Sequence, residues 1–156
     1  MMKIKILYVE NNCRFVETVC KAFLSEYDVT VVPTINNAKK LAQQQQFTIF
    51  IVDYDLDDGK GSEFVRYVRQ KKDDSFIIAA SSHQKGNEEL VNAGANFICA
   101  KCHFDKINFI LQKLSENNIE KIENYQTNFV IDSDRATYKY KRQNTQKFLN
   151  DLGLDF

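Results

Sequence analysis

Five short apolar runs alternate with amphipathic segments along most of this chain. The runs, which we predict to be strands, are 4–9, 29–32, 48–52, 76–80 and 97–100. The segments between them carry apolar residues at helical spacing, and we predict helices at 13–26, 35–45, 61–71, 87–93 and 105–114. The runs 4–9 and 48–52 are apolar on both faces, as in the central strands of a parallel sheet. The pattern therefore predicts an α/β fold in which a doubly wound parallel sheet lies between two layers of helices.

Length and composition predict one domain with a modest extension. The chain has 156 residues, of which 44% are hydrophobic and 27% are charged, and these values are typical of globular proteins. We assign 1–117 to the domain and 118–156 to a partly helical extension. An extension of this length is too short to be a second full domain.

The sequence has no feature of a membrane or exported protein. No stretch approaches the about 18 consecutive apolar residues that a spanning helix needs. The first apolar run ends at Val9 without a small-residue cleavage site, so we interpret it as a strand rather than a signal peptide. The four cysteines are accordingly expected as thiols in the cytoplasm. The net charge is zero, so no long-range field attracts the chain to nucleic acid or anionic lipid.

Polar residues follow four of the predicted strands. Glu10 and Asn11 follow the first strand, Asp53 the third, Ser81 the fourth and Lys101 the fifth. Each alone has a simpler explanation as a helix cap, a turn residue or a solvated side chain. Together they are expected to meet at the carboxyl edge of the sheet, where doubly wound folds bind ligands. We therefore predict a site that combines carboxylates, a hydroxyl and an ammonium group.

The segments KILYVENN, IVDYDLDDGKG, IIAASS and GANFICAK resemble the receiver domains of two-component response regulators, and the resemblance covers residues 3–117. It implies a flavodoxin-like sheet of five parallel strands in the order 2-1-3-4-5, flanked by five helices. It also implies that Asp53 accepts a phosphoryl group from a histidine kinase or a phosphotransfer protein. In this family Ser81 would supply the hydroxyl that senses the phosphoryl group, Lys101 the ammonium that pairs with it, and Glu10 part of a magnesium site.

The expected magnesium site departs from the family pattern at Asn11, where a second acid is usual. An amide keeps an oxygen ligand but loses a full negative charge, so we expect weakened binding of Mg²⁺ by Glu10, Asn11, Asp53 and the backbone carbonyl of Asp55. The Asp55 carboxylate could partly restore the missing charge. That hypothesis predicts that Asp55→Asn weakens magnesium binding far more than Asp57→Asn does.

Two further departures lie on the fifth strand and just after it. Cys102 stands where the family has a proline joined by a cis peptide bond. A cis bond before another residue costs about 2.5 to 4 kcal/mol, so we predict a trans bond between 101 and 102. Ile98 stands where the family often has an aromatic residue that reports the phosphorylation state. A last departure lies before the third helix, where Asp57 replaces a proline that the family usually has, although Gly59 and Gly61 keep the turn that leads into this helix.

Other chemical motifs are weaker. Cys99, Cys102 and His103 match a haem attachment pattern in CAKCH, but Cys99 falls within an apolar strand that should point it into the core. A zinc site would need Cys13 as a fourth ligand. The chain has neither GxGxxG nor GKS for nucleotide phosphates, and only two histidines for acid and base chemistry. We therefore expect a phospho-acceptor signalling domain rather than an enzyme with a separate substrate.

The extension 118–156 is too short to contain an output domain that binds DNA. It contains a possible helix at 119–125, an apolar run at 129–131 and a stretch at 135–147 with five basic residues. Basic stretches are more often solvated surface than nucleic-acid sites, so nucleic-acid binding is disfavoured. The apolar residues at 148–156 are expected to dock on the domain, on a second copy or on a partner.

Two alternative functions stay open at this stage. A pseudo-receiver would keep the fold as a protein-interaction module without phosphotransfer, and Asn11 and Cys102 favour this alternative. An adaptor for nucleic acid would use the basic stretch 135–147. Magnesium with beryllofluoride or acetyl phosphate separates the first from a phosphorylated switch, and the salt dependence of binding tests the second.

Overall fold

The computed structural model describes residues 4–121. Its elements are β1 (Lys5–Val9), α1 (Cys13–Phe23), β2 (Asp28–Val32), α2 (Ile35–Gln44), β3 (Ile49–Val52), β4 (Asp55–Leu56), β5 (Gly59–Lys60), α3 (Gly61–Gln70), β6 (Phe76–Ala79), α4 (Gln84–Ala93), β7 (Phe97–Ile98), the 3-10 helix η1 (Lys101–Lys106) and α5 (Ile107–Ser115). Of the predicted helix 119–125, residues 119–121 are described and are helical. The predictions for the basic stretch and for the apolar residues 148–156 lie outside the described residues.

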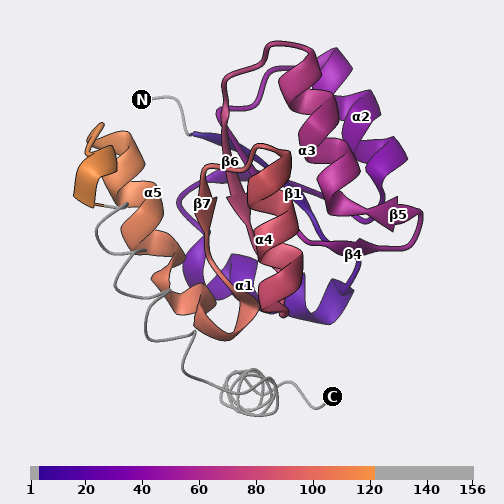
Figure 1. Cartoon of the computed structure of the whole chain (residues 1–156). Helices are drawn as coiled ribbons and strands as arrows, with labels where there is room; N and C mark the ends of the chain where they lie inside the picture. Colours follow the sequence, from indigo (N-terminus) through magenta and orange to yellow (C-terminus); the bar gives the residue numbers. More distant parts are fainter. Residues whose placement is uncertain (1–3, 122–156) are drawn as a thin grey trace.

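The main sheet has five parallel strands in the order β2-β1-β3-β6-β7 (Figure 1). Since β6 and β7 are the fourth and fifth strands of this sheet, the predicted order 2-1-3-4-5 is confirmed. All four residues of β3 are buried, which agrees with a central strand covered on both faces. Within the described residues, no helix has the length and apolar character of a membrane span.

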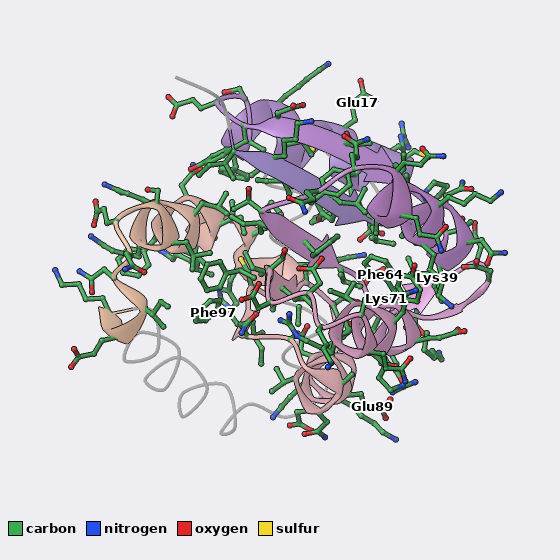
Figure 2. All side chains as sticks on the ribbon, turned by 90° about the horizontal axis from the view of Figure 1, so that it is seen from above. Glu17, Lys39, Phe64, Lys71, Glu89 and Phe97 are labelled. Carbon is green, nitrogen blue, oxygen red and sulfur yellow. The ribbon has the colours of Figure 1, made fainter. Side chains whose placement is uncertain are left out.

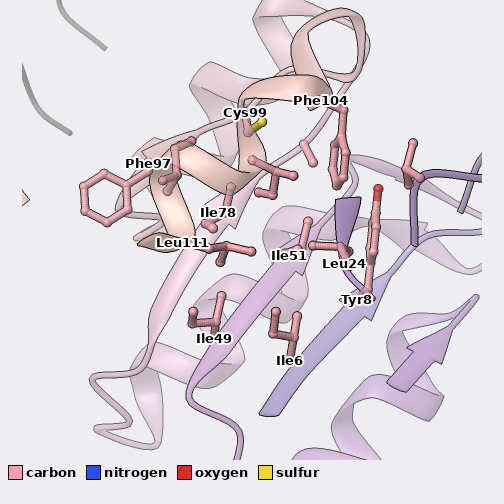
Figure 3. Close-up of a cluster of buried hydrophobic side chains, with 14 of the residues drawn as sticks. Ile6, Tyr8, Leu24, Ile49, Ile51, Ile78, Phe97, Cys99, Phe104 and Leu111 are labelled. Atoms are coloured by element: carbon pink, nitrogen blue, oxygen red, sulfur yellow. The ribbon is translucent and has the colours of Figure 1, made fainter. Parts of the chain in front are cut away.

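Alternate residues of the central strands enter two separate apolar cores. Ile6 and Tyr8 of β1 pack with residues of α1 and α5, including Phe15 and Leu111. Figure 3 shows Ile6, Tyr8 and Leu111 in this core. Leu7 of β1 packs on the other face with residues of α2, α3 and α4. The structure therefore has the three layers that the apolar pattern predicts, because consecutive strand residues point to opposite faces. Figure 2 shows Phe64 on α3 and Phe97 on β7, which belong to these two different cores.

The structure differs from the predicted elements mainly after β3 and after β7. The small antiparallel hairpin of β4 and β5 was not predicted, because two-residue strands are too short to show a periodicity. Directly after its turn, at the start of β5, Gly59 has a φ of 147°, a conformation that favours glycine. The predicted helix 105–114 is divided into η1 and α5. The 101–102 peptide bond is trans, as predicted, and Cys99 is buried in the core, also as predicted.

Arg69 of α3 connects two loops at the edge of the sheet where β6 and β7 begin. Its guanidinium donates to the backbone oxygens of Asp73 at 2.8 Å, Ser75 at 2.9 Å and Gly94 at 2.9 Å. A fourth hydrogen bond reaches Asn96 Oδ1 at 2.8 Å. Burial lowers the pKa of Arg69, although its side chain stays charged at neutral pH. One side chain thus fixes the loop before β6 to the loop before β7.

Replacing Arg69 by alanine should lower the free energy of unfolding by about 2 kcal/mol, because several charged hydrogen bonds are lost together. Arg69→Lys should give an intermediate loss, since an ammonium group cannot reproduce the planar fork. Urea unfolding followed by circular dichroism measures both changes. An Arg69→Ala variant within about 0.5 kcal/mol of the wild type would contradict a structural role for this side chain.

Candidate functional site

The carboxyl ends of β1, β3 and β7 bring two carboxylates and one ammonium group together. Lys101 Nζ lies 2.8 Å from Glu10 Oε2 and 3.3 Å from Asp53 Oδ2. Glu10 is 1% exposed and Asp53 is 4% exposed. The Lys101 ammonium also lies 5.2 Å from the centre of the Phe15 ring on α1, which covers the site from one side. The structure therefore places Glu10, Asp53 and Lys101 in one buried cluster.

The backbone holds these residues by continuing the hydrogen-bond pattern of the sheet beyond the strands. The Asp53 N–H donates to the carbonyl of Val9 at 2.9 Å, and the Glu10 N–H donates to the carbonyl of Val32 at 3.0 Å. The Lys101 N–H donates to the carbonyl of Ser81 at 3.2 Å. The positions of the site residues are consequently set by strand pairing.

The second oxygen of the Glu10 carboxylate is held by the start of α1. Glu10 Oε1 accepts a hydrogen bond from the N–H of Asn12 at 3.0 Å. The side chain of Asn12 in turn caps α1 by accepting from the N–H of Phe15 at 3.1 Å. The Glu10 carboxylate is therefore fixed at both oxygens, by a backbone N–H and by Lys101.

The electrostatics of this cluster show a shortage of positive charge. Burial, with the neighbouring charge of Asp53, raises the pKa of Glu10 to about 7. Burial also raises the pKa of Asp53, against the opposing effect of Lys101. Burial opposes the charged form of Lys101, but the two carboxylates outweigh that effect and raise its pKa. One ammonium group thus only partly neutralises two buried carboxylates, an arrangement that suits a further cation.

Ser81 is buried near the same edge and, besides its backbone hydrogen bond with Lys101, it contacts the start of α4. Its Oγ accepts from the N–H of His83 at 3.1 Å, and it faces Gly86, where an added Cβ would lie 2.7 Å from Oγ. The backbone of Ser81 is bound by the buried Asn87 side chain, which accepts from the Ser81 N–H at 2.8 Å and donates to the Ser81 carbonyl at 3.1 Å. Ser81 is therefore joined directly to α4.

Two acidic residues of the hairpin, Asp55 and Asp57, have different partners. The Asp55 carboxylate pairs with Lys60 across β4 and β5, and the Lys60 ammonium lies 5.0 Å from the centre of the Tyr54 ring. Asn11 Nδ2 instead donates to Asp57 Oδ1 at 2.9 Å. The structure thus gives Asp57, rather than Asp55, the side-chain contact with Asn11.

Sequence reasoning missed three residues that surround the site. Asp57 occupies a position where the family has proline, and that departure was the available signal. Tyr54 follows the acceptor position, and its hydroxyl donates to Glu89 of α4; Figure 2 shows Glu89 on α4. This hydrogen bond raises the pKa of Tyr54. No sequence pattern indicated the contact between Asn87 and Ser81.

The residues that could hold a metal offer oxygen ligands. In the described part of the chain, no group of three or more His, Cys, Asp or Glu side chains is placed to bind a metal ion. The cluster contains the carboxylates of Glu10 and Asp53, and Asn11, the residue after Glu10, carries an amide oxygen. Such a donor set, with its excess negative charge, fits Mg²⁺ better than zinc.

Comparisons with known proteins agree with this geometry. The sequence model of the response regulator receiver domain matches residues 6–115. The receiver domain of Francisella response regulator 1452 has a TM-score of 0.65 at 15% identity, covering 73% of this chain and 98% of that chain. The receiver domain of an HD domain-containing protein from Pseudomonas fluorescens Pf-5 has a TM-score of 0.68 at 14% identity, covering 79% and 94%. The phosphorylated cyanobacterial phytochrome response regulator RcpA has a TM-score of 0.63 at 15% identity, covering 72% and 94%. No curated sequence gives a significant match.

Proposed function

This chain belongs to the family of response regulator receiver domains, and from that membership we propose that it accepts a phosphoryl group on Asp53 and thereby changes its protein contacts. Receiver domains are signalling domains of two-component systems. The observation that carries the proposal is the buried cluster in which Lys101 Nζ contacts both Glu10 and Asp53. The direct test is whether the chain acquires a phosphoryl group from acetyl phosphate and Mg²⁺, and whether Asp53→Asn prevents it.

The proposed transfer is a displacement at phosphorus. A carboxylate oxygen of Asp53 attacks the phosphorus of a phosphohistidine on a histidine kinase or phosphotransfer protein, and a P–O bond forms as the P–N bond breaks. The electron pair of the broken bond returns to the imidazole nitrogen, which takes a proton from water. The Lys101 ammonium pairs with an oxygen of the arriving phosphoryl group, because it is a compact charge with three donors. A histidine kinase as donor also implies a cytoplasmic location.

Glu10, Asn11, Asp53 and the backbone carbonyl of Asp55 are the groups that would hold Mg²⁺. When bound, the ion supplies the positive charge that offsets the repulsion between the carboxylate and the phosphoryl oxygens. The raised pKa values of Glu10 and Asp53 support this part of the proposal, because they show that Lys101 alone does not neutralise the site.

Ser81 would detect the transferred group. Its hydroxyl accepts from the N–H of His83 through a lone pair, so its hydrogen can rotate and donate to a phosphoryl oxygen. Because Asn87 binds both backbone groups of Ser81, a shift of Ser81 pulls directly on α4. We propose that this contact transmits the effect of phosphorylation to the surface of α4. It would take the place of the aromatic reporter that is usual in the family, because this chain has Ile98 at that position.

Asn87→Ala should separate phosphorylation from the response of α4. With beryllofluoride and Mg²⁺, amide NMR shifts at Asp53 and Lys101 should persist in this variant, while those along α4 should be lost. The matched control is Glu88→Ala, which alters an exposed neighbour and should retain both sets of shifts. Asn87→Asp keeps the acceptor for the Ser81 N–H and should retain part of the α4 response. Full α4 shifts in Asn87→Ala would contradict the proposed route.

A pseudo-receiver is the competing function, favoured by the amide of Asn11 in place of an acid. It predicts that neither acetyl phosphate nor beryllofluoride changes the wild-type protein in the presence of Mg²⁺. The adaptor for nucleic acid depends on the stretch 135–147, which lies outside the described residues, and it predicts binding that weakens steeply with added salt.

A further inference from the structure

The hydrogen bond between Asn11 and Asp57 can fix the orientation of the Asn11 amide. An acid at position 11 would need no such orientation, because its two side-chain oxygens are equivalent. An amide side chain has a donor end and an acceptor end, whereas a carboxylate offers only acceptors. Asn11 Nδ2 donates to Asp57 Oδ1 at 2.9 Å. We infer that Asp57 is a positioning residue, which holds the Asn11 amide so that Oδ1 rather than the NH₂ group is presented to the metal. This inference rests on the proposed function.

The orientation of the Asn11 amide determines whether its side chain attracts or repels a cation. The NH₂ group carries partial positive charge and would repel a divalent cation, while Oδ1 is a suitable ligand. Because the Asp57 carboxylate can accept but cannot donate, it stabilises only the orientation in which the NH₂ group faces Asp57, which leaves Oδ1 free to act as a ligand. Its charge also polarises the amide and makes Oδ1 a stronger ligand.

The hairpin around Asp57 is anchored so that this contact can be maintained. The carboxylate of the next residue, Asp58, accepts from the N–H groups of Ile35 at 2.8 Å and Asn36 at 3.0 Å, at the start of α2. On the other side of the turn, Asp55 pairs with Lys60. Asp55 and Asp58 are therefore engaged with other groups, and Asp57 is the acid of this hairpin that contacts Asn11.

The first experiment measures the binding of Mg²⁺ alone to the full chain by amide NMR titration. Asp57→Ala should weaken the affinity about 10-fold, the usual effect of losing a group that orients a metal ligand. Asp55→Ala should weaken it less, which reverses the order expected from the sequence, because Asp55 pairs with Lys60. Glu63→Gln, which removes an exposed charge on α3, should leave the affinity unchanged. The affinity of Asp57→Asn for Mg²⁺ should fall between those of the wild type and Asp57→Ala, because the new amide can bond to either end of the Asn11 amide. Equal losses from Asp57→Ala and Asp55→Ala would overturn the inference.

The second experiment separates orientation from simple charge. In an Asn11→Asp background both side-chain oxygens are equivalent and need no orienting group, so adding Asp57→Ala should cost far less affinity than it does beside Asn11. The same loss in both backgrounds would show that Asp57 acts only through its charge, and would overturn the inference. Absence of Mg²⁺-dependent shifts in both the wild type and Asn11→Asp would instead refute the proposed function.

Discussion

Asp53→Asn should abolish phosphoryl transfer from acetyl phosphate, while the wild-type chain becomes labelled in the presence of Mg²⁺. The expected loss is complete, because an amide lacks the anionic oxygen that attacks phosphorus. The other carboxylate of the buried cluster, Glu10, cannot replace it, since it is already bound by the Asn12 N–H and by Lys101. Intact-mass spectrometry measures the label directly.

The loss of label in Asp53→Asn should not reflect unfolding. Burial raises the pKa of Asp53, because removing the carboxylate from water costs free energy that the nearby Lys101 only partly offsets. A neutral side chain of the same shape removes that cost and the repulsion with Glu10, while Lys101 keeps its contact with Glu10 at 2.8 Å. The variant should therefore be at least as stable as the wild type in urea. Glu17→Gln, at an exposed position on α1, serves as a control that should label normally.

A label that persists in Asp53→Asn would contradict the assignment of the acceptor. Peptide mapping would then show which other side chain carries the phosphoryl group. A wild type that takes no label, although it is folded and supplied with Mg²⁺, would favour the pseudo-receiver.

The sheet and the central cluster could be predicted because both follow from local sequence. Apolar runs determine which segments are strands, and the residue after a parallel strand always lies at the same edge of the sheet. Glu10, Asp53 and Lys101 therefore meet as expected. The strand order came from the resemblance to a family, since the apolar pattern alone does not distinguish one order from another.

The contacts around the cluster could not be predicted because they depend on turn geometry and on helix placement. The hairpin of β4 and β5 decides whether Asp55 or Asp57 reaches Asn11. Its strands have two residues each, so they produce no periodic pattern in the sequence. The contact of Asn87 with Ser81 depends on where α4 packs against the end of β6. Such contacts are made by loop and helix residues rather than by the residues that directly follow the strands. Knowing where the strands end therefore does not reveal them.

Gly61→Ala should damage both the fold and the site, because α3 begins directly against the acceptor residue. A Cβ at position 61 would lie 1.9 Å from the carbonyl oxygen of Asp53 and 3.0 Å from Val52 Cγ1. The backbone at Gly61 is also fixed, since its N–H donates to the carbonyl of Tyr54 at 2.6 Å. The methyl group can be accommodated only if α3 and the end of β3 separate.

We expect Gly61→Ala to lower the free energy of unfolding by about 3 kcal/mol, at the upper end of the usual cost of overpacking. The fraction that stays folded should also label poorly, because moving the Asp53 backbone shifts its carboxylate away from Lys101. Urea unfolding and mass spectrometry on the same sample measure the two effects. Ser62→Ala is the matched control, since it changes the next buried residue without adding an atom. Wild-type stability and labelling in Gly61→Ala would show that α3 can move away from β3 without displacing Asp53, which would contradict the close packing that holds the acceptor in place.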